Sequence, residues 1–528
     1  MDRFSDWMYS LNGWVWGPVM IVLLVGTGLY LTVRLRLVQV FHFGHAVRCI
    51  SGKYDDPGEQ GDITHFQALC AALSATIGTG NIAGVATAIA LGGPGAVFWM
   101  WVTALVGMAT KFTCCSLALR FRVIGPDGSA SGGPMYYLER GLGQKWLGVV
   151  FAVFAGLASL GIGCAVQSNS VADGLLSVMP AAWRQTRVSG DVALIGGTVL
   201  AKPIIGVVLA VLVGVVTIGG IRRIASVAEK IVPLMCVVYI VGAVVVLVRH
   251  ADAIPQAFAQ IFRYAFTPIA AGGGFFGVVM TRTIQKGVAR GVFSNEAGLG
   301  SAPMAHAAAK THEMIREGFV AMLGPFIDTI VICTMTALVI VCTGAWHVRS
   351  ASGELLYGPG GKGVATTAKI NDRDVQVVGS PGDSSEPFRD EQGNCYPLPT
   401  GAALTVAAFE AGLPGIGHFI VAFGLVFFAY STMICWSYYG DRCWGYLLGR
   451  RAIVPYRYLF CVFVFIGTIS GLDLIWTIAD NLNALMALPN LVGLLLLSPI
   501  VVPEARDYIR RMREGATESA PPGRDPES

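Results

Sequence analysis

Long apolar runs alternate with short polar connections along most of the chain. The runs reach about 20 residues, which is the length that a helix needs to cross the hydrocarbon core of a bilayer. This alternation predicts an all-α polytopic membrane protein with about eleven transmembrane helices. We number them spans 1 to 11, at about 14–36, 66–90, 94–119, 147–178, 203–220, 228–248, 267–290, 317–344, 415–438, 455–471 and 473–503.

The basic residues predict the orientation of these spans, because every strongly basic connection follows an odd-numbered span. The residues concerned are Arg34, Arg36, Arg48 and Lys53; Arg120, Arg122, Arg140 and Lys145; Arg222 and Arg223; Arg290, Lys310 and Arg316; Arg442, Arg450 and Arg451; and Arg506, Arg510, Arg511 and Arg513. Since basic loops stay in the cytoplasm, we expect the N-terminus outside and the C-terminus inside. The long polar insert 345–400 is then extracellular, and 504–528 is a cytoplasmic tail. The end of this tail has a composition typical of disordered segments.

The composition supports a membrane protein and argues against several other classes. Of the 528 residues, 54% are hydrophobic and 13% charged, whereas soluble domains are about 25% charged. A net charge of +4 gives no indication of nucleic-acid binding. The chain has neither a GxSxG elbow nor a HExxH helix, and its twelve cysteines form no CxxC pair, so we expect no enzyme. Only Cys395 lies in the long polar insert, and we predict no disulfide framework.

Span 2 contains a stretch that is unsuited to a regular helix. Its centre is Gly78-Thr79-Gly80-Asn81, and irregular backbone survives in hydrocarbon only where it lines a cavity. Span 7 has a comparable stretch at Gly272 to Gly277, five spans later. Because five is odd, a repeat of spans 2–6 onto spans 7–11 is inverted in the membrane. Paired glycine-interrupted helices in two such halves point to the binding site of a secondary transporter.

Other interpretations of span 2 and of the chain stay open at this point. Gly80 and Gly84 form a GxxxG pattern, which brings helices together without unwinding them. Glycine-broken helices also build channels, although channels usually owe their symmetry to several subunits. An interrupted helix, in contrast, exposes amide donors at the positive end of its second half and free carbonyls at the end of its first half. These groups suit a carboxylate and a small cation, respectively.

Several longer motifs carry a family resemblance. They are QALCAALSATIGTGNIAGVATAI, GGPGAVFWMW, GGPMYYLERGLG, VQSNSVADGL, GVARGVFSNEAGLGSAPMAHAAAKT, FIDTIVICTMTAL and FAYSTMICWSYYGDR. From about Phe66 to Ser498 the chain resembles the alanine or glycine:cation symporters of bacteria and archaea. It departs from them in two places: Cys114 and Cys115 follow the MATK motif where members usually carry an acidic residue, and the loop between spans 8 and 9 is unusually long.

The resemblance implies the fold of the leucine transporter, with one leading helix and two inverted five-helix repeats whose first helices are discontinuous. Residues 1–65 then hold the leading helix and a cytoplasmic linker, and 66–250 hold the first repeat. Residues 251–503 hold the inverted second repeat, including the extracellular loop 345–400, and 504–528 form the tail. These boundaries are expectations drawn from the family.

The resemblance also implies a function: import of small neutral amino acids, alanine or glycine, by symport with Na+ through alternating access. Coupling to H+ is the alternative, and an ion channel is a more distant one. The expected location is the plasma membrane of a prokaryote, which is the inner membrane in a Gram-negative cell. The expected partners are the amino acid, Na+ and the lipid bilayer, without nucleic acid and without an obligate protein partner.

For the substrate, the resemblance implies that the backbone amides of Thr79 and Gly80 bind the carboxylate. Gly80 allows this close approach because it has no side chain. The side-chain carbonyl of Gln167 receives the substrate ammonium, unless this buried amide only satisfies a helix end. Three bulky residues wall the side-chain pocket and favour small substrates, unless they are ordinary core: Phe276, Met280 and Trp436.

For Na+, the resemblance implies the backbone carbonyls of Ser74 and Ile77 together with the hydroxyls of Ser431 and Thr432 in span 9. The alternative for these hydroxyls is a bond to the carbonyls of their own helix. Asn81 either ligates a second ion or holds the broken helix together by hydrogen bonds.

Other polar residues keep several possible roles. Asp328 in span 8 carries a coupling proton, completes a cation site or hydrogen-bonds the NEAG segment. Asn295 and Glu296 of that segment are expected near the cytoplasm as gate or helix-capping residues, with Glu296 able to pair with an arginine. A last polar cluster, either a gate or a structural network, consists of Asp480, Asn481 and Asn483.

Overall fold

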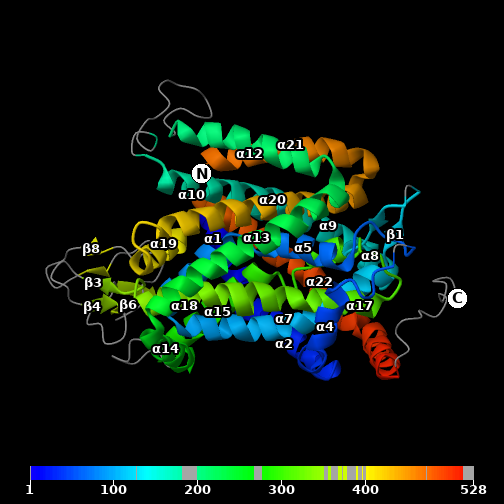
Figure 1. Ribbon diagram of the computed structural model, residues 1–528, viewed down its shortest axis with the longest axis horizontal. Helices are drawn as coiled ribbons and strands as arrows, with labels where there is room; N and C mark the ends of the chain where they lie inside the picture. The colour runs from blue at the N-terminus through cyan, green and yellow to red at the C-terminus, as the bar shows by residue number, and fades with distance from the viewer. Residues whose placement is uncertain are drawn as a thin grey trace.

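The computed structural model describes most of the chain. The residues outside the description are 1, 57, 127, 181–182, 184–198, 267–275, 350–354, 358–366, 371–372, 377–387, 390–394, 397–399, 471 and 515–528. For residues 2–4, 276–282, 472–475 and the strands between 350 and 399, only the backbone is described. The described part is almost entirely helical (Figure 1). This confirms the predicted all-α fold class.

The helices up to residue 249 are α1 (Asp2–Val15), α2 (Pro18–Arg34), α3 (Val38–Phe41), α4 (Phe43–Ile50), α5 (His65–Thr76), the π-helical η1 (Gly80–Gly84), α6 (Val85–Gly92), α7 (Gly95–Arg120), α8 (Pro134–Arg140), α9 (Lys145–Leu160), the π-helical η2 (Gly161–Ala165), α10 (Val166–Val178), α12 (Ala201–Thr217) and α13 (Gly220–Arg249).

The later helices are the 3-10 turn η3 (Ala251–Ala253), α14 (Ile254–Phe266), α15 (Phe276–Asn295), α16 (Ala302–His306), α17 (Met314–Pro325), the π-helical η4 (Phe326–Cys333), α18 (Thr334–Thr343), α19 (Gly401–Gly412), α20 (Gly417–Leu448), the 3-10 turn η5 (Arg450–Ala452), α21 (Ile453–Ile469) and α22 (Leu472–Arg513). The described strands pair as four short antiparallel hairpins: β1 (Val123–Ile124) with β2 (Ala130–Ser131), β3 (Val348–Arg349) with β4 (Leu355–Tyr357), β5 (Thr367–Ile370) with β6 (Arg373–Gln376), and β7 (Phe388–Arg389) with β8 (Cys395–Tyr396).

In the described part, eight helical segments are long and apolar enough to cross a membrane, or nine if the bent pair formed by α5 and α6 counts as one span. These nine correspond to predicted spans 1–4, 6 and 8–11. Predicted span 5 corresponds to α12, which has only 17 residues. Predicted span 7 corresponds to α15, which carries Arg282, Lys286 and Arg290 and is therefore too polar to qualify by composition. The sequence analysis missed α19, which follows the long polar insert.

Glycines let α7 lie closely against two neighbouring helices, α15 and α17. A Cβ atom on Gly291 of α15 would lie 2.3 Å from the hydroxyl oxygen of Thr103 in α7. A Cβ atom on Gly318 of α17 would lie 2.3 Å from the hydroxyl oxygen of Ser116, which is also in α7. Small residues permit this close helix packing in membranes, where the hydrophobic effect does not drive helices together. The tight packing explains part of the high glycine content and positions α15 beside the interrupted helix.

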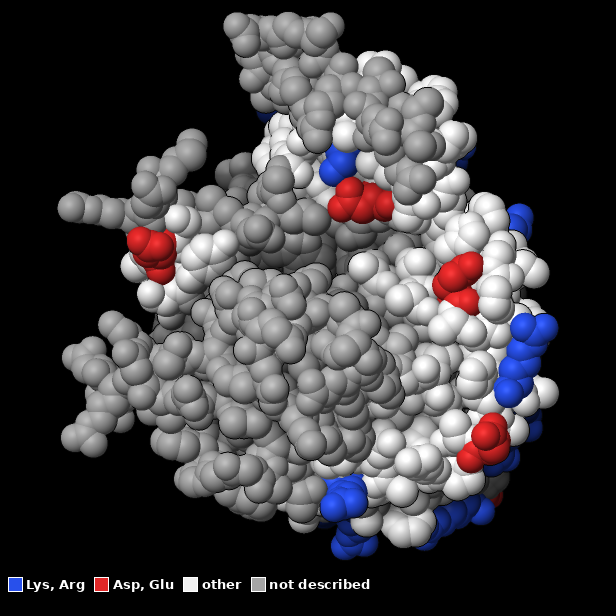
Figure 2. Space-filling view, turned by 90° about the vertical axis from the view of Figure 1, so that its left-hand side faces the viewer, with Lys and Arg blue, Asp and Glu red and all other residues white. Residues whose placement is uncertain are grey.

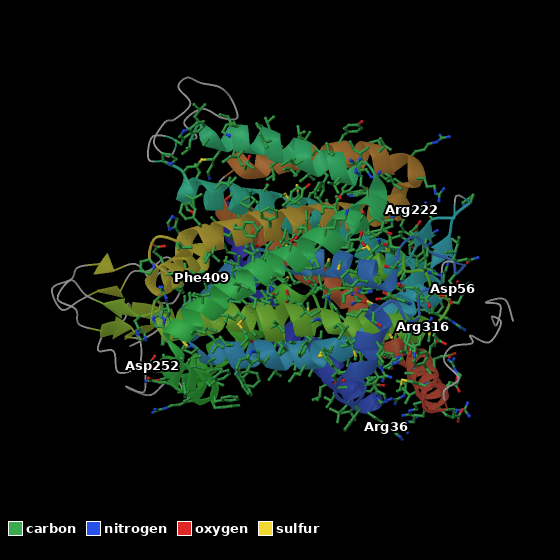
Figure 3. The ribbon with its side chains drawn as sticks, viewed as in Figure 1. Arg36, Asp56, Arg222, Asp252, Arg316 and Phe409 are labelled. Carbon is green, nitrogen blue, oxygen red and sulfur yellow. The ribbon has the colours of Figure 1, made fainter. Side chains whose placement is uncertain are left out.

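The helices run between two distinct ends of the molecule. Arg36, Arg222 and Arg316, from connections after three odd-numbered spans, all lie at one end (Figure 3), which we call the basic end. Asp252 lies at the opposite end, where β3 to β8 and α19 also lie (Figures 1 and 3). Figure 2 shows this opposite end, where acidic and basic side chains of the described surface occur singly rather than in a patch. These four residues lie at the ends that the predicted order of spans requires.

Candidate functional site

Span 2 is interrupted where the sequence predicts it. The α-helix α5 ends at Thr76, and Ile77 has φ −77° and ψ 86°, outside the helical region. Helix resumes as the π-helical turn η1 at Gly80, and the two halves are bent by 54°. The predicted discontinuity within Gly78-Thr79-Gly80-Asn81 is therefore confirmed. The alternative interpretation, close helix packing through the GxxxG pattern, has no support at Gly84. A Cβ atom placed there would have no described atom of a neighbouring helix within 4 Å.

Asn81 bridges the interruption and ties it to span 8. Its Oδ1 atom accepts a hydrogen bond of 2.9 Å from the backbone amide of Gly78. Its Nδ2 atom donates to Oδ1 of Asp328 at 2.6 Å, and the hydroxyl of Thr336 donates to the Asn81 carbonyl at 2.8 Å. Both the amide oxygen and the amide nitrogen of Asn81 are thus engaged in holding the broken helix.

The proposed Na+ ligands come together where α5 meets α20. The Ser431 hydroxyl lies 3.4 Å from the carbonyl oxygen of Ser74, and the Thr432 hydroxyl lies 3.5 Å from that of Ile77. Ser74 also donates its own hydroxyl to the Ser431 carbonyl at 2.6 Å. Both hydroxyls on α20 bond at 2.9 Å to the Phe428 carbonyl of their own helix as well. Four of the five predicted cation ligands therefore share one site, whereas Asn81 contacts a different set of residues.

Gln167 contacts the amide that was predicted to bind a carboxylate. Its Oε1 atom accepts from the backbone N–H of Thr79 at 3.4 Å, and its Nε2 atom donates to the carbonyl of Ile162 in η2 at 3.2 Å. The Thr79 hydroxyl is buried without a hydrogen-bond partner among the described residues. An amide oxygen is an acceptor like a carboxylate oxygen. Gln167 thus accepts from an amide at the start of the second half-helix, the amide that was predicted to bind a carboxylate.

Span 7 has a described interruption beyond the stretch at which the sequence predicts one. Its expected break at Gly272 to Gly277 falls mostly on residues outside the description, and α15 begins at Phe276. The described break lies between α15, which ends at Asn295, and α16, which begins at Ala302. Glu296 there has a left-handed φ of 55°. α15 thus continues to Asn295, past the predicted end of span 7 near residue 290, and Asn295 and Glu296 are buried. The expected position of the NEAG segment near the cytoplasm stays a prediction.

The described break of span 7 lies directly beside that of span 2. A Cβ atom on Gly80 would meet the ring of Phe293 at 3.2 Å and the backbone of Ser294 at 3.3 Å. Ser294 donates its hydroxyl to Oδ2 of Asp328 at 2.9 Å, while Asn81 donates to the other carboxylate oxygen. Asp328, fully buried in η4, therefore joins the two interrupted helices. Among the described contacts Asp328 does not hydrogen-bond the NEAG segment, as one predicted role required: Ser294 precedes that segment, and Asn295 donates to the Thr329 hydroxyl at 3.1 Å instead. Its other two predicted roles, in carrying a proton and in completing a cation site, stay predictions.

Glu296 lies at the site, where it is 5% exposed. Its carboxylate accepts from the indole N–H of Trp436 at 3.0 Å and from the Ser301 hydroxyl. The expected pairing with an arginine was wrong: within the described chain, Glu296 forms no ion pair with one. The buried ammonium of Lys111 interacts electrostatically with this carboxylate and with that of Asp328.

A small cavity of about 10 Å³ lies among these groups. It is lined by Ala75, Thr76, Gly78, Gly80, Ile162, Gln167, Phe293, Glu296, Thr432, Trp436 and Asn483. Trp436 fills one side and packs so closely on η2 that a Cβ atom on Gly163 would lie 2.4 Å from it. Such a volume holds about one water molecule, so the lining must move apart to admit an amino acid.

The remaining predicted residues divide into three groups. Phe276 and Met280 lie in the first turns of α15, and their side chains are outside the description. Asn483 lines the cavity with its Oδ1 atom unpaired among the described residues. Its two predicted companions lie elsewhere: Asp480 is 3.8 Å from Arg290 of α15, and Asn481 hydrogen-bonds Asn12 of α1 at 2.9 Å. The three residues therefore do not form one cluster.

Glu296, Phe293 and Lys111 are the site residues that the sequence analysis did not place there. Their signal was present, because Lys111 is a charge within an apolar span and Glu296 stands in the motif with the strongest family likeness. A charge within a span is a functional-site candidate by default. Glu296 was instead assigned to a connection because the segment around it is polar and rich in glycine.

Comparisons with known proteins agree with this geometry. The model of the sodium:alanine symporter family matches residues 1–358 and 393–521. The sodium/alanine symporter AgcS of Methanococcus maripaludis is 44% identical over 96% of this chain and 97% of its own length. An uncharacterized transporter of Haemophilus influenzae is 41% identical over 96% of each chain, and the amino-acid carrier protein AlsT of Bacillus subtilis is 32% identical over 98% of this chain and 94% of its own. The family is one of membrane transporters and not of enzymes, and this chain belongs to the sodium:alanine symporter family.

Proposed function

We propose that this protein imports a small neutral amino acid, alanine or glycine, by symport with Na+. The single observation that carries the proposal is the contact between the carbonyl end of α5 and the Ser431–Thr432 pair of α20 beside the cavity. This contact brings together four oxygen atoms from two helices, at the end of α5 where the backbone carbonyls lack hydrogen-bond donors from their own helix. The function in the printed name of AgcS, at 44% identity, supports the same conclusion.

Na+ binds between α5 and α20 in this proposal. The carbonyls of Ser74 and Ile77 and the hydroxyls of Ser431 and Thr432 face the ion. Oxygen ligands of this kind suit a hard cation, and the negative end of a half-helix favours it. Bound Na+ thereby fixes the end of α5 and, through it, the start of the second half-helix.

The substrate carboxylate binds the backbone amides of Thr79 and Gly80. It displaces the side-chain carbonyl of Gln167. This oxygen lies 3.4 Å from the Thr79 nitrogen, which is long for a hydrogen bond, so the interaction is weak. Each ligand raises the affinity of the other, because Na+ and the carboxylate organise the same interrupted backbone.

The substrate ammonium binds Glu296 rather than Gln167. Glu296 lines the cavity with a carboxylate, and a charged acceptor binds an ammonium more strongly than a neutral amide does. Trp436 limits the pocket, since Gly163 behind it leaves no room to retreat. Phe276 and Met280 complete the wall as predicted from the family, and small substrates such as alanine and glycine follow from this limit.

Alternating access follows from the family's inverted five-helix repeats, spans 2–6 and 7–11, with the basic end facing the cytoplasm of a prokaryotic cell. The two interrupted helices move as a unit because Asp328 joins them. Tilting of this unit against α20 opens the site to one side and then to the other. A proton-coupled symporter is the second candidate, because Asp328 and Glu296 are buried carboxylates within the spans.

Uptake into proteoliposomes tests the function. Purified protein is reconstituted, and labelled alanine or glycine uptake is measured under an imposed Na+ gradient or an imposed H+ gradient. We expect saturable uptake that requires the Na+ gradient. Uptake driven by a pH gradient without Na+ would establish the second candidate instead, and conductance without saturation would indicate a channel.

A further inference from the structure

A second and much larger cavity lies at the basic end, far from the substrate site. It has a volume of about 570 Å³ and lies between the end of α2, the short helix α3 and the last turns of α22. Four arginines line it: Arg36, Arg506, Arg510 and Arg513. Figure 1 shows the end of α22 beside α4, and Figure 3 shows Arg36 at the same corner.

One carboxylate, Glu514, also lines the cavity, so the four arginines leave its lining with an excess of positive charge. Arg510 pairs with Asp507 at 2.6 Å. Among the described residues, no carboxylate oxygen lies within 4.0 Å, the limit for an ion pair, of Arg36, Arg506 or Arg513. His42 also lines the cavity, with Nδ1 buried and unpartnered among the described residues. Burial, and after it the charge of Arg513, lowers the pKa of His42.

The mouth of the cavity is apolar and exposed. Phe41 lines the cavity and is 71% exposed, and its neighbour Val40 is 58% exposed. Leu37 at the start of α3 is 45% exposed. The adjoining helix α4 buries His45, Ala46 and Cys49 on one face and exposes Val47 and Arg48 on the other. An arrangement of exposed apolar side chains beside arginines is typical of segments that lie in the membrane interface.

We propose that this cavity is a binding site for an anionic phospholipid. The phosphate of the headgroup binds Arg36, Arg506 and Arg513, and an acyl chain covers Phe41 and Val40. Basic pockets at the cytoplasmic ends of transmembrane helices recognise lipids in this way. A soluble phosphate would satisfy the arginines but would leave the apolar mouth uncovered, and the acidic tail 515–528 lacks the long apolar side chains that would cover it. The proposal does not depend on the transported substrate.

Native mass spectrometry of the full-length protein in detergent tests the lipid site. The probes are phosphatidylglycerol, phosphatidylcholine and inorganic phosphate. We expect phosphatidylglycerol to be retained at least about tenfold better than phosphatidylcholine. The triple variant R36Q/R506Q/R513Q should lose this preference, whereas R120Q/R140Q/R451Q, which removes the same charge from exposed positions outside the cavity, should keep it.

The variant Phe41→Ser separates the lipid from a free anion, because it keeps every charge. We expect it to weaken retention of phosphatidylglycerol, and an elution profile unchanged in size-exclusion chromatography shows that the fold is kept. Equal retention by the wild type, the triple variant and F41S would overturn the proposal. So would displacement of phosphatidylglycerol by inorganic phosphate at millimolar concentration. If lipid bound only after removal of 515–528, the tail would be the occupant and the proposal would also be wrong.

Discussion

His306 of α16 and Glu317 of α17 are joined by a hydrogen bond of 2.6 Å between Nδ1 and Oε1. The second carboxylate oxygen of Glu317 accepts from Nδ1 of His65, the first residue of α5. All three side chains are buried. The half-helices of the two interrupted spans that lie toward the basic end therefore meet on one carboxylate.

The surrounding backbone strengthens this junction. Ile63, just before α5, forms a parallel bridge with Ala309, just after α16. Arg122 donates to the carbonyl oxygens of Ala309 and Thr311 at 2.7 and 2.8 Å. In the proposed transport cycle, release of substrate toward the basic end requires this junction to separate.

Replacement of Glu317 by Gln should weaken this junction. Breaking a buried pair costs about 3–5 kcal/mol when one partner loses its charge, so we expect a clearly lower melting temperature in detergent. Asp173→Asn is the matched control, because the Lys202–Asp173 pair is partly exposed and such pairs contribute about 0–1 kcal/mol. Equal melting temperatures for the two variants would contradict a stabilising role for the junction.

Replacement of Thr432 by Ala tests the Na+ site. The loss of one oxygen ligand should raise the Na+ concentration for half-maximal alanine binding by about tenfold, which corresponds to about 1.4 kcal/mol. Alanine affinity at saturating Na+ should change little. Ser437→Ala is the control, because this buried hydroxyl on the same helix donates only to its own helix, at Ile434. A Na+ dependence of T432A equal to that of S437A would show that Thr432 is not a ligand.

Replacement of Glu296 by Gln tests the ammonium site. A hydrogen bond to a charged group contributes about 1.5–3 kcal/mol, so alanine affinity should fall about 10- to 100-fold while its Na+ dependence stays. Competition by lactate, which has the carboxylate but a hydroxyl in place of the ammonium, should be unaffected. Gln167→Ala gives the comparison. If Q167A lowers the affinity for alanine but not for lactate, and E296Q does not, the ammonium binds Gln167 instead.

The sequence predicts the first half of the site well and the second half poorly. At Gly78 and Gly80 the weak helix formers coincide with the true interruption, and the motif likeness correctly pairs Ser431 and Thr432 with Ser74 and Ile77. Gly78 and Gly80 were recognisable as weak helix formers within an apolar span, whereas the four cation ligands were recognisable only through the family motifs.

In span 7, however, the sequence did not predict the described interruption after Asn295. Polarity indicates a connection only if the polar group faces water, and Glu296 faces Trp436 and Ser301 in the interior. Arg290 of α15 likewise lies opposite Asp480 rather than in a loop. Such partners come from distant parts of the chain, and no local pattern contains them.

Replacement of Gly163 by Ala tests the limit on substrate size. The new methyl group would lie 2.4 Å from Trp436 and push the indole toward the cavity. Overpacking of this kind costs about 1–3 kcal/mol, and we expect alanine uptake to fall more than glycine uptake. Gly26→Ala on α2 is the control, because no described atom lies within 4 Å of a Cβ there. An equal loss of both substrates in G163A would indicate a general folding defect rather than a size limit.

His45 gives the protein a pH-dependent contact at the basic end. It lies in α4, between the first two spans, and its Nε2 atom lies 3.0 Å from the hydroxyl of Tyr508 near the end of α22. Its ring packs edge-on against Phe319 at a centroid distance of 4.9 Å. The imidazole thus joins the linker after span 1 to spans 8 and 11 in its neutral form.

Burial, followed by the charges of Arg48, Arg316 and His42, lowers the pKa of His45 to about 4. In the unfolded chain the pKa of histidine is about 6.5, so between these pH values only the unfolded state binds this proton. The contribution of neutral His45 to the free energy of unfolding is therefore fully present above about pH 6.5, and it is lost as the pH falls toward 4. We expect the melting temperature of the wild type to fall more between pH 7.5 and pH 5 than that of His45→Gln. The variant His312→Gln, at a partly exposed histidine, should retain the wild-type dependence; the same pH dependence in H45Q and the wild type would show that another group is responsible.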